Sequence, residues 1–153
     1  NNISAADSII KGNWGGFSEP VAMLVAAESP VIAGLAGVIL GAAAERAAVV
    51  LDDAATLAGA LVAVELAPLA GEYLVGSHFS AERGSEEAIR LLGMQAYLKL
   101  GMNLGEGTGA ALGISLLKAS MHVLNDMKTF GDAAVPVAED GPGALVQNPD
   151  VRD

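Results

Sequence analysis

The chain has 153 residues, 52% of them hydrophobic and 17% charged, with a mean hydropathy of +0.47, which suits one folded domain with a real core and argues against disorder. It contains no cysteine, so disulfides and thiolate metal sites are excluded. The formal net charge of −10 makes nucleic acid a poor partner, although backbone N–H groups could still bind a small anion locally.

The first part of the chain predicts a polar lead-in followed by helices. Residues 1–17 are predicted to form a loop, or a short helix plus loop, and lack the basic and apolar regions of a secretory signal. Helices are predicted at 18–28, with Ser18 as N-cap, and at 29–46, where small residues allow close packing. The longest uncharged stretch, 29–44, is shorter than the roughly 20 apolar residues of a membrane span. We therefore expect a cytoplasmic protein with no membrane partner.

Short buried strands and helices alternate in the rest of the chain. In order, the sequence predicts a strand within 47–53, a helix ending near Pro68, a strand and then a loop in 72–84, a helix at Ser85–Leu92, an ambiguous segment at 95–104 and a long helix at 107–127. This alternation predicts an α/β domain at 18–130 with a parallel sheet. The tail at 131–153, rich in Pro, Gly and Asp, is expected to be mobile.

Polar residues follow the predicted strands. They form three segments, 52–53, 77–83 and 105–108. In parallel sheets ligands bind beyond the carboxyl ends of the strands, so these segments are predicted to converge on a site. Asp52 or Asp53 could also cap the helix that follows them, and that is the simpler role.

The segment Gly105-Glu106-Gly107-Thr108-Gly109 opens the long helix. Its glycines would let a ligand approach the backbone, and a carboxylate at a helix N-terminus would stay ionised and could accept a proton. Spacing alone favours a plainer role, in which Glu106 or Thr108 only caps the helix. The segment matches neither the Walker loop nor the dinucleotide fingerprint.

The loop "GSHFSAERG" offers two hydroxyls and an imidazole. Gly76, Ser77 and Ser80 could bind a phosphate, or the serines could simply cap turns. His78 is interpreted as a structural histidine, because the G-x-S-x-G elbow of a serine hydrolase is missing. His122 is interpreted as a helix-edge residue without chemistry.

Three stretches together resemble a known family. "VIAGLAGVILGAAAERAAVVLD", "YLVGSHFSAERG" and "LGMNLGEGTGAALGISLLKASMHVLNDMKTF" resemble the nicotinate-nucleotide:dimethylbenzimidazole phosphoribosyltransferases of cobamide biosynthesis. The resemblance covers about residues 30–135 and the carboxyl-terminal half of that enzyme. It implies a Rossmann-like parallel sheet flanked by helices, with the C-terminal helix contributing to a small helical subdomain. It also implies a homodimer or a paired subunit.

The same resemblance implies the chemistry. The family transfers phosphoribosyl from nicotinate mononucleotide to a lower-ligand base such as dimethylbenzimidazole, giving α-ribazole phosphate and nicotinate. Glu106 matches the glutamate taken as general base, and the residues expected to bind substrate are Gly76, Ser77, Ser80, Gly105, Gly107 and Thr108. No cofactor and no metal ion are expected, because a positioned base suffices for this transfer.

Two departures from the family pattern leave alternatives open. Asp53 stands where the family usually has a glycine, and a carboxylate there would repel a phosphate. The family's Gly-Asn-Thr-rich segment, with a further glutamate, is absent, so we expect an incomplete site in this chain alone. The alternative function is a non-catalytic or divergent partner subunit, such as one of an enzyme that uses phenolic bases. A third interpretation is an unrelated α/β domain that binds a small anion.

Overall fold

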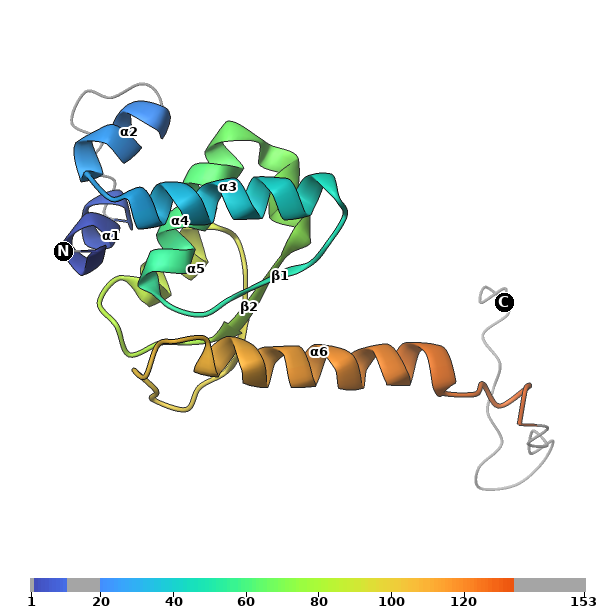
Figure 1. Cartoon of the computed structure of the whole chain (residues 1–153). Coiled ribbons are helices and arrows are strands. Elements are labelled where there is room, and N and C mark those ends of the chain that lie inside the picture. Colours follow the sequence, from blue (N-terminus) through green and yellow to red (C-terminus); the bar gives the residue numbers. More distant parts are fainter. Residues whose placement is uncertain (1, 11–19, 134–153) are drawn as a thin grey trace. The chain divides into compact units, whose positions relative to one another are not determined.

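The computed structural model describes residues 2–10 and 20–133 (Figure 1). The chain divides into two compact units, Asn1–Lys118 and Ala119–Asp153. Within the described residues the helices are α1 (Asn2–Ile10), α2 (Pro20–Ala27), α3 (Pro30–Ala44), α4 (Ala54–Leu66), the 3₁₀ helix η1 (Pro68–Tyr73), α5 (Ser85–Leu91) and α6 (Thr108–Asp126). Helix α6 begins in the first unit and ends in the second. The predicted N-cap Ser18 and the tail from residue 134 onward lie outside the described residues.

One parallel sheet joins the strands of the first unit. It consists of β1 (Val49–Leu51), β2 (Leu74–His78) and β3 (Ala96–Leu98), in that order, with Val50 opposite Val75 and Gly76 opposite Ala96. The predicted α/β fold with a parallel sheet is therefore confirmed, and the ambiguous segment at 95–104 contains a strand. One boundary is corrected, because β2 continues through Ser77 and His78, which the sequence placed in the following loop.

Helix α4 is the centre of the core. It packs against α1, α3, α5 and η1, and most of its residues from Ala54 to Ala63 are buried, including Leu57, Ala58 and Val62. A helix surrounded in this way can be apolar on every side, which explains why its sequence shows no polar face. At Gly59 of α4 an added Cβ would lie 2.9 Å from the Leu35 Cβ and 3.2 Å from the Ala36 backbone nitrogen, so α3 and α4 pack closely there. The glycines of α3 itself do not take part, because a Cβ added at Gly34, Gly37 or Gly41 meets nothing within 4 Å, and to that extent the prediction of close packing through the small residues of 29–46 is wrong.

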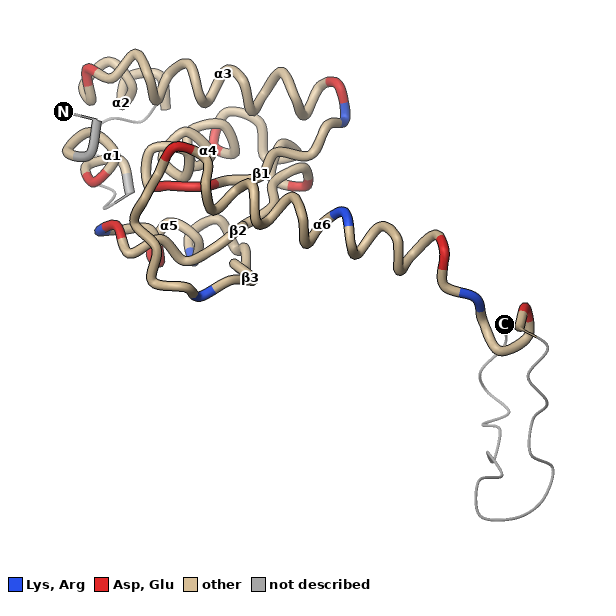
Figure 2. The backbone as a smooth tube through the Cα atoms, turned by 60° about the horizontal axis from the view of Figure 1, so that its bottom comes forward, with Lys and Arg blue, Asp and Glu red and all other residues tan. Residues whose placement is uncertain are grey.

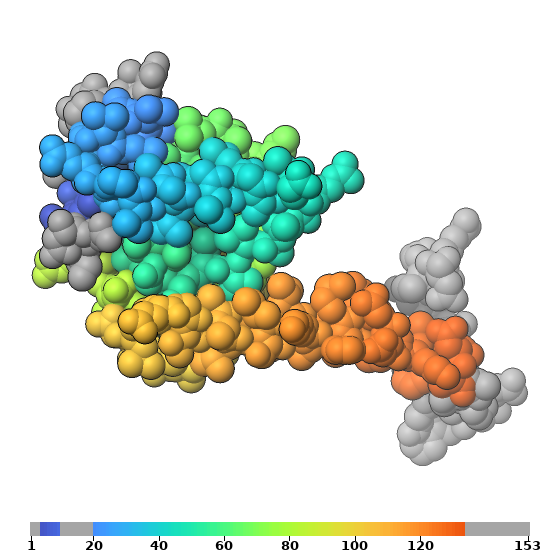
Figure 3. All heavy atoms as spheres, viewed as in Figure 1, coloured from blue at the N-terminus to red at the C-terminus, as the bar shows by residue number. Residues whose placement is uncertain are grey.

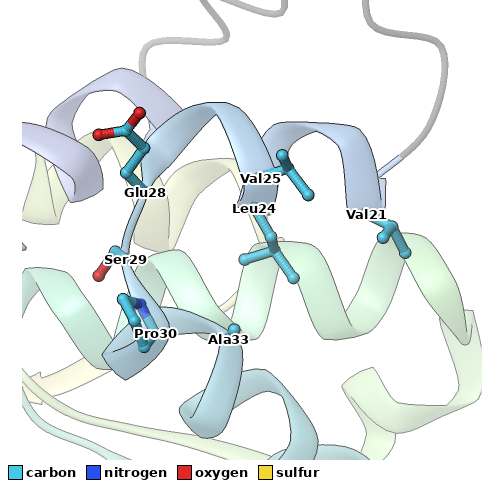
Figure 4. A pocket seen from close by; sticks show the side chains of 7 residues that line it. All are labelled: Val21, Leu24, Val25, Glu28, Ser29, Pro30 and Ala33. Carbon is cyan, nitrogen blue, oxygen red and sulfur yellow. The ribbon is translucent and has the colours of Figure 1, made fainter.

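The outward face of helix α3 is apolar. No charged residue lies between Glu28 and Glu45, and Figure 2 shows this helix uncoloured along its length, with acidic residues only at its two ends. Val38 is 65% exposed, and the whole helix lies at the surface on the side seen in Figure 3. Between α2 and α3 runs an apolar groove, drawn in Figure 4 and lined by Val21, Leu24, Val25, Glu28, Ser29, Pro30 and Ala33.

Candidate active site at the carboxyl edge of the sheet

The polar segments that follow the strands do meet. Asp52, directly after β1, accepts hydrogen bonds from the start of α6, and its carboxylate lies 3.8 Å from His78 at the end of β2. Glu82, in the loop after β2, reaches the start of α4. The predicted convergence of 52–53, 77–83 and 105–108 at one edge of the sheet is confirmed by these contacts.

Asp52 occupies the N-terminus of α6. Its Oδ2 accepts the Gly107 N–H at 2.8 Å and its Oδ1 accepts the Ala110 N–H at 2.8 Å. Gly107 directly precedes the helix and has no side chain that could accept these N–H groups. The Asp52 carboxylate, just after the carboxyl end of β1, therefore takes the place of the usual N-cap side chain. The prediction that Glu106 or Thr108 caps the helix is wrong. The cap comes from a residue that lies far earlier in the chain.

Asp53 serves the other helix that starts at this edge. It is the N-cap of α4, where Oδ1 accepts the Thr56 N–H at 2.9 Å and the Thr56 hydroxyl group completes a capping box. Glu82 Oε2 accepts another N–H of the same helix end, that of Ala54, at 2.8 Å. Asp53, where the resemblance led us to expect a glycine, therefore has a local role, since its carboxylate accepts a hydrogen bond from the first turn of α4.

Truncation of this cap gives a direct stability test. Asp53→Ala leaves the Thr56 N–H without its acceptor, so we expect the free energy of unfolding to fall by about 0.5–2 kcal/mol. Asp53→Asn keeps an oxygen acceptor, so its free energy of unfolding should fall by much less. Urea denaturation of both variants checks this. Equal losses for Ala and Asn would show that the cap does not depend on the acceptor oxygen.

His78 and Ser77 are buried beneath α6. Ser77 is 1% exposed and His78 is 5% exposed. The Ser77 hydroxyl donates to the Leu51 carbonyl and lies 3.0 Å from His78 Nδ1, which therefore donates to it. His78 is thus a buried histidine with a hydrogen-bond partner, which agrees with its interpretation as a structural histidine.

The first turns of α6 touch the sheet through glycines. A Cβ added at Gly109 would lie 2.0 Å from His78 Nδ1 and 2.7 Å from Asp52 Oδ1, and one added at Gly113 would lie 2.7 Å from the Ser77 Cβ. Sequence reasoning missed this role. The signal for it was present, because two glycines four apart mark one face of a helix.

Glu106 lies in a left-handed turn. Gly105, Glu106 and Gly107 have φ values of 64°, 56° and 82° in succession. Glycine adopts this conformation freely, whereas for a residue with a side chain it costs about 1–2 kcal/mol. The other non-glycine residues with positive φ, Glu28 and Arg46, follow the ends of α2 and α3, where such a conformation is common. Glu106 instead precedes a helix, where its backbone is strained and its side chain is exposed, and backbone strain of this kind clusters at functional sites.

The remaining residues predicted to bind substrate differ in accessibility. Gly76 is buried in β2, where an added Cβ would lie 2.5 Å from the Gln95 carbonyl oxygen. Ser80 is half-buried, and its hydroxyl accepts the Glu82 N–H at 3.2 Å. The Thr108 N–H donates to the Gly105 carbonyl at 3.1 Å, which closes the turn around Glu106. Their roles toward a ligand stay predictions.

Other predictions from the sequence concern metals, membranes and His122. Residues 2–10 and 20–133 hold no group of three or more His, Cys, Asp or Glu side chains that could hold a metal ion. In the same part of the chain, none of the helices has the length and apolar character needed to cross a membrane. His122 is exposed, and its Nδ1 lies 2.7 Å from Oδ2 of Asp126, one turn later in α6.

The fold and these contacts define a parallel α/β domain whose acidic and polar side chains gather beyond the carboxyl ends of the strands. Small ligands bind in this place in open parallel sheets. The chain belongs to a family of phosphoribosyltransferases, whose model matches residues 3–135.

Named relatives agree with this membership. The chain is 51% identical over 104 residues to a nicotinate-nucleotide–dimethylbenzimidazole phosphoribosyltransferase of Roseiflexus sp. (strain RS-1), covering 68% of this chain and 30% of the relative. It is 45% identical over 117 residues to the enzyme of that name from Geobacter sp. (strain M21), covering 76% and 34%. The chain thus spans about a third of the length of these relatives.

Solved structures share the fold. A crystal structure of nicotinate-nucleotide-dimethylbenzimidazole phosphoribosyltransferase from Thermus thermophilus superposes with a TM-score of 0.73 at 29% identity, covering 89% of this chain and 49% of that one. A structure of CobT from the same organism gives a TM-score of 0.74 at 28% identity, covering 90% and 51%. The expected Rossmann-like arrangement is in keeping with both.

Proposed function

We propose that this chain provides the base-bearing part of an enzyme that transfers phosphoribosyl from nicotinate mononucleotide to a lower-ligand base such as dimethylbenzimidazole. The products are α-ribazole phosphate and nicotinate, as in cobamide biosynthesis. The observation that carries the proposal is the strained, exposed Glu106, held between two left-handed glycines at the ligand-binding edge of the sheet. Family membership supports the reaction class.

In the proposed reaction a bond forms between a benzimidazole nitrogen and C1′ of the ribose while the bond from C1′ to the nicotinate ring nitrogen breaks. The electron pair of the broken bond goes to the pyridinium nitrogen, so nicotinate leaves as a neutral ring. The Glu106 carboxylate takes the proton that the benzimidazole must lose. Because the leaving group is already activated, the protein needs to supply orientation and one base.

The nucleotide is proposed to bind beside the same edge. Gly76, Ser77 and Ser80 would lie near the phosphate, with Gly105, Gly107 and Thr108 around the reacting centre. Ser80 is the residue of the first group with a half-buried hydroxyl, since the Ser77 hydroxyl is buried and bonded to Leu51. Ser80→Ala is therefore the substitution that should raise the KM for nicotinate mononucleotide.

The test uses a chimaera in which residues 3–135 of this chain replace the matching part of the Roseiflexus relative. When the chimaera is given nicotinate mononucleotide and dimethylbenzimidazole, we expect it to release nicotinate. Chromatography measures the nicotinate released. Glu106→Gln should lower kcat by about 10²–10⁴-fold, which is the usual contribution of a general base. Unchanged turnover in Glu106→Gln, or a folded chimaera without any turnover, would contradict the proposal.

One observation favours a second function, that of a non-catalytic or divergent partner subunit. Helix α3 lies at the surface on the side seen in Figure 3. Its outward face is apolar and made largely of small residues, so it is suited to pack against another polypeptide surface. Calorimetric titration separates the two proposals. A chimaera that assembles but binds no nicotinate mononucleotide supports the second, and a homodimer that binds it supports the first.

A further inference from the structure

We propose that Asp52 is a positioning residue that holds the Gly105–Gly107 turn, and with it Glu106, in the left-handed conformation the reaction needs. The link from this turn to catalysis rests on the proposed function of Glu106. The hold on the turn itself does not, because it follows from hydrogen bonds on the protein alone.

The two bonds act on both sides of the point where the turn becomes a helix. The Gly107 N–H belongs to the peptide group that joins Glu106 to Gly107, so its bond to Asp52 fixes the plane next to the Glu106 Cα. The Ala110 N–H belongs to the first turn of α6, so the second bond fixes the helix start. One carboxylate thereby sets the orientation of the turn relative to the helix.

Asp52 is itself rigidly placed. Its side chain is buried, with 6% of the residue exposed, and its own N–H donates to the Thr56 hydroxyl at 3.0 Å. Charge-assisted bonds of this kind are strong, and more so where water is excluded. The left-handed backbone of Glu106 is strained, and this strain can be sustained because the next residue, Gly107, is bound through its N–H to the buried Asp52 carboxylate.

The same contacts decide what cannot bind here. The Gly107 and Ala110 N–H groups already have an anionic acceptor, and Gly109 leaves no space beneath them. A substrate anion therefore finds the start of α6 occupied by Asp52. Glu106 lies before this helix end, on the exposed side of the turn.

Asp53 offers a matched control. It is the neighbouring carboxylate and also caps a helix, but its partner is Thr56 in α4. Asp52→Asn removes one of two anionic oxygens that accept the Gly107 and Ala110 N–H groups, whereas Asp53→Asn changes the same charge without touching the turn. A loss specific to Asp52→Asn cannot come from charge or from general helix capping.

The first arm of the test uses the 153-residue chain and amide hydrogen exchange by NMR. Amides at the start of a helix ordinarily exchange fast, because they have no partner within the helix. Since the Gly107 and Ala110 N–H groups donate to Asp52, we expect these two amides to exchange slowly in the unsubstituted chain. Asp52→Asn should speed both by at least about tenfold, and Asp53→Asn should not. Unprotected Gly107 and Ala110 amides in the unsubstituted chain would overturn the proposal, and this measurement needs no variant to fold.

The second arm measures turnover in the chimaera described above. We expect Asp52→Asn to lower kcat about 10–100-fold with the KM for nicotinate mononucleotide changed less than about threefold, since misplacement of a catalytic group by an ångström can cost about 10². On the Glu106→Gln background the same substitution should have no further effect. A full additive loss there would show that Asp52 does not act through Glu106.

The two arms separate the possible failures. Protected amides together with unchanged turnover in Glu106→Gln would refute the proposed function while keeping the hold of Asp52 on the turn. Unprotected amides together with a large loss in Glu106→Gln would refute the role of Asp52 and keep Glu106 as the base.

Discussion

Gly109→Ala should destabilise the protein by at least about 1 kcal/mol, although alanine is the better helix former. The added Cβ would lie 2.0 Å from His78 Nδ1, 2.1 Å from His78 Cε1 and 2.7 Å from Asp52 Oδ1. His78 is buried and cannot retreat, so the first turn of α6 must move away from the sheet. Overpacking of this kind costs about 1–3 kcal/mol, and the shift also breaks the hydrogen bonds that the Gly107 and Ala110 N–H groups donate to Asp52.

The control for Gly109→Ala is the same substitution on α3. At Gly37 an added Cβ meets nothing within 4 Å, so Gly37→Ala should stabilise the protein by about 0.5–1 kcal/mol through helix propensity. Urea unfolding of both variants should therefore give changes of opposite sign. A Gly109→Ala protein as stable as Gly37→Ala would mean that α6 does not rest on His78 and Asp52.

Leu57→Ala should cost about 2–5 kcal/mol of unfolding free energy. Leu57 lies in α4 and is 2% exposed, in the cluster that joins this helix to α1, α3 and α5. Truncation removes buried methyl groups and leaves a cavity that its neighbours cannot fill. Since small domains have only about 5–15 kcal/mol of stability in total, this single change can remove a large share of it.

A matched leucine tests whether the loss in Leu57→Ala comes from burial. Leu69, in η1, is 72% exposed, so Leu69→Ala should change the unfolding free energy by no more than about 0.5 kcal/mol. Thermal denaturation followed by circular dichroism compares the two variants. Similar losses at the two positions would contradict α4 as the centre of the core.

Local patterns were sufficient for most of the helices and for the first strand. The apolar β-branched run at 49–51 predicted β1, and the alternation of such runs with helices predicted the parallel sheet. Ser29 is the N-cap of α3, which begins at Pro30, within one residue of the start that the sequence predicted. These features depend on residues within a few positions of one another, so the local sequence is enough to predict them.

The boundary of β2 was less readable. Ser77 and His78 are polar, and polar residues after an apolar run predict a loop. In the structure both side chains are buried at the end of the strand, because they find partners in Leu51 of β1 and in each other. Such partners are supplied by a neighbouring strand, which the local sequence does not show.

By itself the sequence determined the α/β class and the convergence of three polar segments at one sheet edge, whereas Glu106 was proposed for proton transfer because of the resemblance to a known family. Only the tertiary structure decided that Asp52, and not Glu106 or Thr108, fills the start of α6. The cap of α4 by Asp53 is one of the two local roles that the sequence predicted for this pair of aspartates. The physical reason is distance along the chain. Helix class follows from neighbours three or four residues apart, whereas Asp52 reaches α6 only after the sheet has formed and its carboxyl ends have been brought together.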